Sequence, residues 1–198
     1  MLKKKFKLFL LLIILVSFIQ NAFSLEPNIF IQSTVNRASQ VLSDGISKEQ
    51  KVEKLKLIAK DTVDIRGVGF YSLGKYRKTL NDNQKKKYID LFEKYFLKSF
   101  SSRLSEYSNP KINVDSQEKI NENYTIVSST LVATKKRPEV KIDWRVYTKN
   151  PENPLIRDLI IEGLSLARTQ KEEFASILNS NDGNINALFA SLEKFINN

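Results

Sequence analysis

Apolar residues repeat with two different periods along this chain of 198 residues. Before Pro110 they recur every three or four residues, which is the spacing of one face of a helix. Over residues 124–161 many of them alternate with polar residues, which is the period of a half-buried strand. Helical spacing then returns. This order predicts a single α+β domain, in which helices pack on one face of an antiparallel or mixed sheet.

Capping residues mark the starts of the helices in the first half of the chain. The first helix is expected over residues 28–43. Ser47 and Gln50 have the spacing of a capping box, in which each side chain hydrogen-bonds the other residue's backbone N–H. Asn81 and Gln84 have the same spacing and predict the start of the longest helix. The apolar face of that helix is rich in aromatic residues and comprises Tyr88, Phe92, Phe96, Phe100, Leu104 and Tyr107.

Three strands are predicted after Pro110 from runs rich in β-branched and aromatic residues. These runs are Tyr124–Thr134, Val140–Tyr147 and Leu155–Ile161. The chain then returns to helix around Phe174, and a last amphipathic helix is expected from Ile185 onward.

The first 24 residues have the pattern of an export signal. Four lysines in residues 3–7 precede the apolar run Leu8–Ile19, and Ala22-Phe23-Ser24 is a small-x-small cleavage site. We therefore expect cleavage after Ser24. Residues 25–198 keep 28 Lys and Arg and 22 Asp and Glu, a net charge of +6. Nucleic acid is not a predicted partner of an exported chain.

The composition excludes several kinds of enzyme. The chain has no cysteine and no histidine, so it has no disulfide, no thiol nucleophile, no imidazole base and no histidine-bearing zinc site. Two carboxylate pairs, Asp61 with Asp64 and Asp158 with Glu162, have spacings that are common by chance and lack a neighbouring motif. Gly67-Val68-Gly69 is a fragment of a phosphate-binding loop and is expected to form a bend near a helix. We predict no enzymatic activity, no catalytic residue, no metal and no cofactor.

Two segments resemble a known family. Residues 63–88 are VDIRGVGFYSLGKYRKTLNDNQKKKY, which is similar to the segment of the MlaC (toluene tolerance) family with V-D-F followed by L-G-x-Y-W-R. Residues 160–178 are IIEGLSLARTQKEEFASIL, which is similar to that family's V-E-G-V-S-L-x-x-x-Y-R-x-x-F. The matching residues are Val63, Asp64, Leu73, Gly74, Tyr76, Glu162, Gly163, Ser165, Leu166 and Phe174. The resemblance covers nearly all of residues 25–198.

The sequence also departs from the family pattern. Ile65 replaces the Phe of V-D-F, and Arg77 replaces the Trp that follows Tyr76. Gln170 and Lys171 stand where the family has Tyr-Arg. Phe100 stands where a Tyr is usual, and the expected Trp before Asp158 is absent.

The resemblance implies a function for the exported chain. It implies that residues 25–198 form a periplasmic lipid-binding domain with an apolar pocket between the sheet and the helices. Its cargo would be a phospholipid with two or more acyl chains. Its partners would be the inner-membrane Mla ABC transporter complex and the outer-membrane lipoprotein–porin complex, and its role would be to maintain outer-membrane lipid asymmetry.

A carrier must shield acyl chains from water. A sixteen-carbon chain left in water costs on the order of 12 kcal/mol, at about 0.8 kcal/mol for each CH₂. We expect the wall of the pocket to be formed by inward strand residues and by the apolar residues that face them. The candidates are Val68, Tyr71, Leu73, Phe92, Phe96, Val127, Leu131, Ile142, Trp144 and Ile160. The same residues could instead be ordinary core. Asp64 and Glu162 are expected to be structural, and Ser165 to cap a helix.

Two other functions remain open from the sequence. One is a carrier of a hopanoid or another apolar lipid, which the lipid content of the purified protein would distinguish. The other is an exported scaffold protein with a filled core and no ligand, which would contain no extractable lipid.

Overall fold

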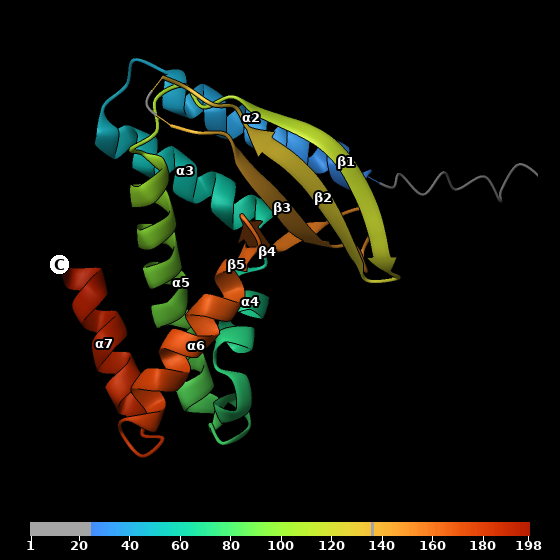
Figure 1. The fold of residues 1–198 in the computed structure, drawn as a ribbon. Helices are drawn as coiled ribbons and strands as arrows, with labels where there is room; N and C mark the ends of the chain where they lie inside the picture. The colour runs from blue at the N-terminus through green and yellow to red at the C-terminus, as the bar shows by residue number, and fades with distance from the viewer. Residues whose placement is uncertain (1–24, 136) are drawn as a thin grey trace, which may run out of the picture.

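The computed structural model describes residues 25–135 and 137–198, so the predicted signal peptide lies outside the described residues. Along the chain, the described residues form a group of helices, then one sheet, and then two further helices (Figure 1). The helices are α2 (Pro27–Ser43), α3 (Lys48–Thr62), α4 (Ile65–Ser72), η1 (Gly74–Lys78), α5 (Asp82–Leu104), α6 (Leu166–Asn179) and α7 (Ile185–Asn197). The strands are β1 (Ile112–Asn121), β2 (Tyr124–Leu131), β3 (Val140–Tyr147), β4 (Leu155–Ile161) and β5 (Leu164–Ser165). The strands pair antiparallel in the order β1-β2-β3-β4-β5, which confirms the α+β prediction.

The predicted helix starts are confirmed. Both capping boxes are complete, Ser47 with Gln50 at α3 and Asn81 with Gln84 at α5. The strand predictions for β3 and β4 have the observed bounds, whereas β2 ends at Leu131, three residues before the predicted end.

Four elements were not predicted: α4, η1, β1 and β5. Strand β1 is polar and mostly exposed, and alternation is limited to its first four residues, where Ile112 and Val114 are half-buried. Its pairing with β2 is interrupted by two irregularities. The bend expected at Gly67-Val68-Gly69 is wrong, because these residues lie within α4. Glycine at position 69 allows close packing, since a Cβ there would lie 2.8 Å from the Phe92 ring.

Three hydrophobic clusters hold the elements together. Phe30, Ile31 and Val35 of α2 pack on Val127, Val146 and Ile156 of the sheet. A small cluster joins α2 to α3. The largest cluster joins α4, α5, α6 and α7, which form the half of the molecule away from the β1–β2 hairpin (Figure 1).

Candidate functional site

One face of the sheet is apolar, and α2 covers only part of it. We call this face, which carries Val127, Val146 and Ile156, the α2 face. In an antiparallel sheet, paired residues share a face and successive residues alternate. The register therefore assigns five more apolar residues of β3 and β4 to the α2 face: Val140, Ile142, Trp144, Leu159 and Ile161. Ile142 is buried and the other four are partly exposed. We call these five residues the β3–β4 strip.

The strip contains two predicted site residues and adjoins a third. Ile142 and Trp144 belong to it, and Leu131 pairs with Val140 at its edge. Trp144 also packs against the cluster that contains Val127. Its indole Nε1 donates a hydrogen bond of 2.8 Å to Ser129 Oγ, so the polar end of the ring is satisfied and its apolar part remains for contact.

A β-bulge separates Ile160 from this group. Arg145 pairs with Asp158 and Val146 pairs with Ile156, which leaves Arg157 as an extra residue on β4. Beyond the bulge the alternation is shifted, and Ile160 pairs with Asp143 on the opposite face of the sheet. Leu159 and Ile161 take its place on the α2 face. Regular alternation in the sequence does not reveal such an insertion, and sequence reasoning therefore missed Leu159 and Ile161.

Four other predicted residues lie in the helical half of the molecule. Val68, Leu73 and Phe92 are buried in the cluster of α4 to α7, and Phe96 packs against it. Tyr71 of α4 is 44% exposed, and Lys171 Nζ lies 5.2 Å from the centre of its ring. The ten candidates therefore do not form one wall. Four lie on the α2 face, four lie in the helical cluster, and Tyr71 and Ile160 lie outside both groups.

Tyrosine hydroxyl groups join the helices of this cluster. Tyr88 OH donates a hydrogen bond of 2.9 Å to Gly69 O, and burial raises the pKa of Tyr88 far above its usual range. Tyr95 OH donates to Gln170 Oε1 at 2.8 Å, and burial also raises the pKa of Tyr95. Gln170, which departs from the family pattern, is therefore the partner of a tyrosine on α5.

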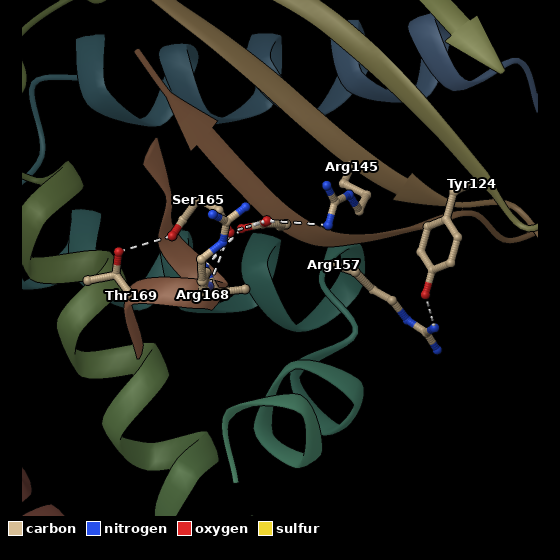
Figure 2. Close-up of polar contacts among 8 residues, drawn as sticks. Tyr124, Arg145, Arg157, Ser165, Arg168 and Thr169 are labelled. Atoms are coloured by element: carbon tan, nitrogen blue, oxygen red, sulfur yellow. Dashed lines mark hydrogen bonds and ion pairs between the residues drawn. The ribbon is translucent and has the colours of Figure 1, made fainter. Parts of the chain in front are cut away.

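The bulge places charged residues on the opposite face of the sheet. Arg157 Nη1 donates to Tyr124 OH at 2.7 Å (Figure 2), and its guanidinium lies 3.4 Å from the centre of the Tyr147 ring. Its Nε and Nη2 each lie 2.7 Å from Asp64 Oδ2. Burial alone would lower the pKa of Arg157, but the hydrogen bonds to Tyr124 and Asp64 outweigh burial and raise the pKa. Through its contacts with Tyr124, Tyr147 and Asp64, Arg157 joins β2, β3 and β4 to the start of α4.

Asp64 has the structural role that was predicted for it. Its Oδ1 accepts a hydrogen bond of 2.8 Å from Gly67 N and so caps α4, while its Oδ2 pairs with Arg157. We expect Asp64→Ala to lower the free energy of unfolding by about 1–3 kcal/mol, because it removes both contacts. Urea denaturation followed by circular dichroism measures this loss. Asp61→Ala is the matched control, since it removes only the exposed pair with Arg37, which we expect to contribute less than about 1 kcal/mol. Equal losses in the two variants would contradict the role of Asp64.

The turn and the cap around β5 explain the second family-like segment. Glu162 and Gly163 both have positive φ, 49° and 82°, in the two-residue turn between β4 and β5. Glu162 Oε1 also accepts from Lys141 N, so its role is structural, as expected. Ser165 Oγ accepts from Arg168 N at 3.1 Å, which confirms the predicted cap, and it donates to Asp158 Oδ2 at 2.6 Å. Figure 2 shows Ser165 beside Thr169, whose Oγ1 donates to Ser165 O.

Other features of the described residues limit what the site can be. Across residues 25–135 and 137–198, no group of three or more acidic residues is placed to hold a metal ion. In the same ranges no helix is both long enough and apolar enough to cross a membrane. A shallow hollow of about 300 Å³ between α2 and α3 is lined in part by Arg37, Asp44 and Lys54 and contains none of the ten candidates.

The fold and the strip define a class of protein, an α+β protein with a partly covered apolar sheet face. Residues 32–194 match the sequence model of the MlaC protein family, and the chain belongs to this family. The fold is similar to that of a phospholipid-binding protein from Ralstonia solanacearum, whose structure was solved in complex with a phospholipid. The TM-score is 0.73 at 18% sequence identity, and the match covers 87% of this chain and 97% of that protein.

Proposed function

We propose that this protein is a periplasmic carrier that binds phospholipid by its acyl chains and moves it between the two membranes. Membership in the MlaC family is the observation that carries the proposal. The phospholipid bound by the Ralstonia protein supports the class of cargo. Family membership supports binding and transport rather than catalysis, and it supports the inner-membrane ABC transporter complex and the outer-membrane lipoprotein–porin complex as partners. The carrier would thereby help to maintain outer-membrane lipid asymmetry.

The β3–β4 strip is the proposed contact surface for the acyl chains. Its partly exposed residues offer apolar area whose removal from water stabilises the complex by about 25 cal/mol for each Å². The residues beneath α2 and those of the helical cluster already pack on one another. Acyl chains therefore enter at the strip and extend inward by replacing contacts between the sheet and the helices. This geometry requires a flexible junction between the sheet and the helical half, not a catalytic group.

The first test is the lipid content of the protein purified from the periplasm of a Gram-negative bacterium. Native mass spectrometry would give the mass of any bound molecule, and solvent extraction would identify it. We expect stoichiometric phospholipid. If the extracted lipid is a hopanoid, the cargo is a hopanoid and not a phospholipid. A lipid-free protein that also takes up no lipid from added vesicles would overturn the proposal and favour a ligand-free scaffold.

A charge placed beside the strip should prevent loading. Leu131 is 6% exposed and pairs with Val140, so Leu131→Arg brings a cation to the edge of the apolar surface. We expect this variant to lose bound lipid by a larger factor than it loses stability. Native mass spectrometry measures the first quantity and thermal unfolding the second.

Two further variants make the result interpretable. Leu57→Arg is the matched control, because Leu57 is 67% exposed on α3 and lies outside the α2 face, and we expect it to retain its lipid. Ile161→Gln changes a half-buried strip residue and serves if Leu131→Arg does not fold. If Leu131→Arg and Ile161→Gln both bind as much lipid as the parent protein, the strip is excluded as the lipid contact.

A further inference from the structure

The net positive charge of the chain is concentrated in one short segment. Residues 65–87 contain seven Lys or Arg and one Asp, a net charge of +6. All the other residues from 25 onward contain 21 Lys or Arg and 21 Asp or Glu, a net charge of zero. The charge that the protein keeps after loss of residues 1–24 is therefore a property of α4, η1 and the start of α5, not of the surface as a whole.

Within this segment, five exposed cations have no acidic partner among the described residues. One is Arg66 on α4, whose guanidinium lies 5.0 Å from the centre of the Phe70 ring. The other four lie on η1 and at the start of α5 and are Lys75, Arg77, Lys78 and Lys86. We call these four residues the basic tip. The neighbouring lysines differ, since Lys85 pairs with Asp82 at 3.2 Å and Lys87 pairs with Glu193 at 3.0 Å. Lys75 Nζ lies 5.2 Å from the centre of the Tyr76 ring, and this is its one described side-chain interaction.

The tip is held in place by the turn between α6 and α7. Tyr76 OH donates a hydrogen bond of 2.6 Å to Asn179 Oδ1, and Gly183 lies against the Tyr76 ring. The α6 residue Lys171 also lies against Gly74 at the start of η1. Figure 1 shows η1 and the α6–α7 turn at the lower end of the molecule, away from the sheet. A positively charged surface is thus presented at one end of an elongated molecule.

We propose that the basic tip is a docking surface for bilayers that contain anionic lipid headgroups. Three of its four residues are lysines, which act as hydrated point charges on flexible stems and make no demand on the geometry of the partner. A protein interface would instead be expected to centre on buried aromatic or arginine anchors. The negative surface potential of a bilayer attracts clustered lysines without such anchors, and the attraction is reversible and weakened by salt.

Docking at the basic tip rests on the proposed function and adds a membrane contact to it. The tip lies in the helical half of the molecule, away from the sheet that carries the β3–β4 strip. Each cation near an anionic surface strengthens binding roughly fivefold. Four such cations give an attraction that holds the carrier at a membrane for a short time and then releases it. The contact depends on charge at the surface and not on the lipid inside the protein.

The experiment compares two quadruple variants of equal net charge in vesicle flotation. The tip variant carries Lys75→Gln, Arg77→Gln, Lys78→Gln and Lys86→Gln. The control carries Lys111→Gln, Lys119→Gln, Lys141→Gln and Lys149→Gln, which are exposed residues in and beside the sheet. The vesicles contain phosphatidylethanolamine with phosphatidylglycerol, or phosphatidylcholine alone. Thermal unfolding verifies that both variants fold.

We expect the parent protein to float with the anionic vesicles at low salt and not with the neutral vesicles. The tip variant should bind the anionic vesicles several hundredfold more weakly, on the order of fivefold for each of the four cations, and the control should change by less than about threefold. Equal weakening of the two variants, equal binding to neutral vesicles, or no binding of the parent at low salt would each overturn the proposal. The lipid content of each variant is measured separately, so a failure of lipid carriage is distinguishable from a failure of docking.

Discussion

Phe92→Ala is expected to lower the free energy of unfolding by about 3–5 kcal/mol. Phe92 is 1% exposed, and its ring lies 5.8–6.2 Å, centre to centre, from the rings of Tyr88, Tyr95, Phe96 and Phe174. Truncation to alanine leaves a cavity between α4, α5 and α6 that these neighbours fill only in part. The expected loss in the free energy of unfolding therefore includes the lost burial of the ring and its lost contacts with these neighbours.

Urea denaturation followed by circular dichroism measures this change. Phe195→Ala is the matched control, because Phe195 is exposed on α7 and touches one ring, that of Tyr95. We expect it to cost less than about 1.5 kcal/mol. Phe92 is also a lipid-contact candidate, so the lipid content of the variant is informative. Unchanged stability with complete loss of lipid would show that Phe92 lines the cargo site and not the core.

Asp158→Ala is the second large effect, with an expected loss of about 2–4 kcal/mol. The Asp158 side chain is 3% exposed. Its Oδ2 accepts from Ser165 Oγ at 2.6 Å, and its Oδ1 accepts from Ala167 N at 2.9 Å. Removal of the carboxylate leaves two buried donors at the start of α6 without a partner, and it also removes the charge that faces Arg145 at 3.8 Å.

Two variants control this prediction. Asp143→Ala changes a half-buried aspartate of β3 for which the described residues provide no hydrogen bond or ion pair, so we expect a loss below about 1 kcal/mol. Asp158→Asn keeps the size and one acceptor and should lie between Asp158→Ala and the parent. Thermal and urea unfolding measure all three. A loss for Asp158→Ala no larger than that for Asp143→Ala would mean that α6 does not depend on this contact.

Both effects concern the junction between the sheet and the helical half. Asp158 ties β4 to α6, and Arg157 ties β4 and β2 to Asp64 at the start of α4. These two adjacent residues lie at the bulge, on the face opposite the β3–β4 strip. Their polar contacts hold the two halves together on one side of the sheet, so separation for acyl chains is expected on the strip side.

Local signals in the sequence were sufficient for most of the secondary structure. The capping boxes at Ser47 and Asn81 involve residues three apart, and the alternation of β3 lies within eight residues. Such patterns act through neighbouring backbone groups, so they can be read without knowledge of distant contacts. The family resemblance was also visible as local patterns, and the family is confirmed over residues 32–194. The export signal stays a prediction, since it lies outside the described residues.

Tertiary structure decided which residues share a surface. Strand β1 alternates only over residues 112–115, and its other residues are in a strand because they pair with β2. Helix α4 accommodates two glycines because Asp64 caps it and Phe92 packs against Gly69. The bulge at Arg157 moves Ile160 to the opposite face and brings Leu159 and Ile161 to the strip. One inserted residue reverses the face of every residue after it, and whether it is inserted depends on pairing with another strand. The sequence therefore determined which segments are helices and strands, whereas long-range pairing determined the composition of the site.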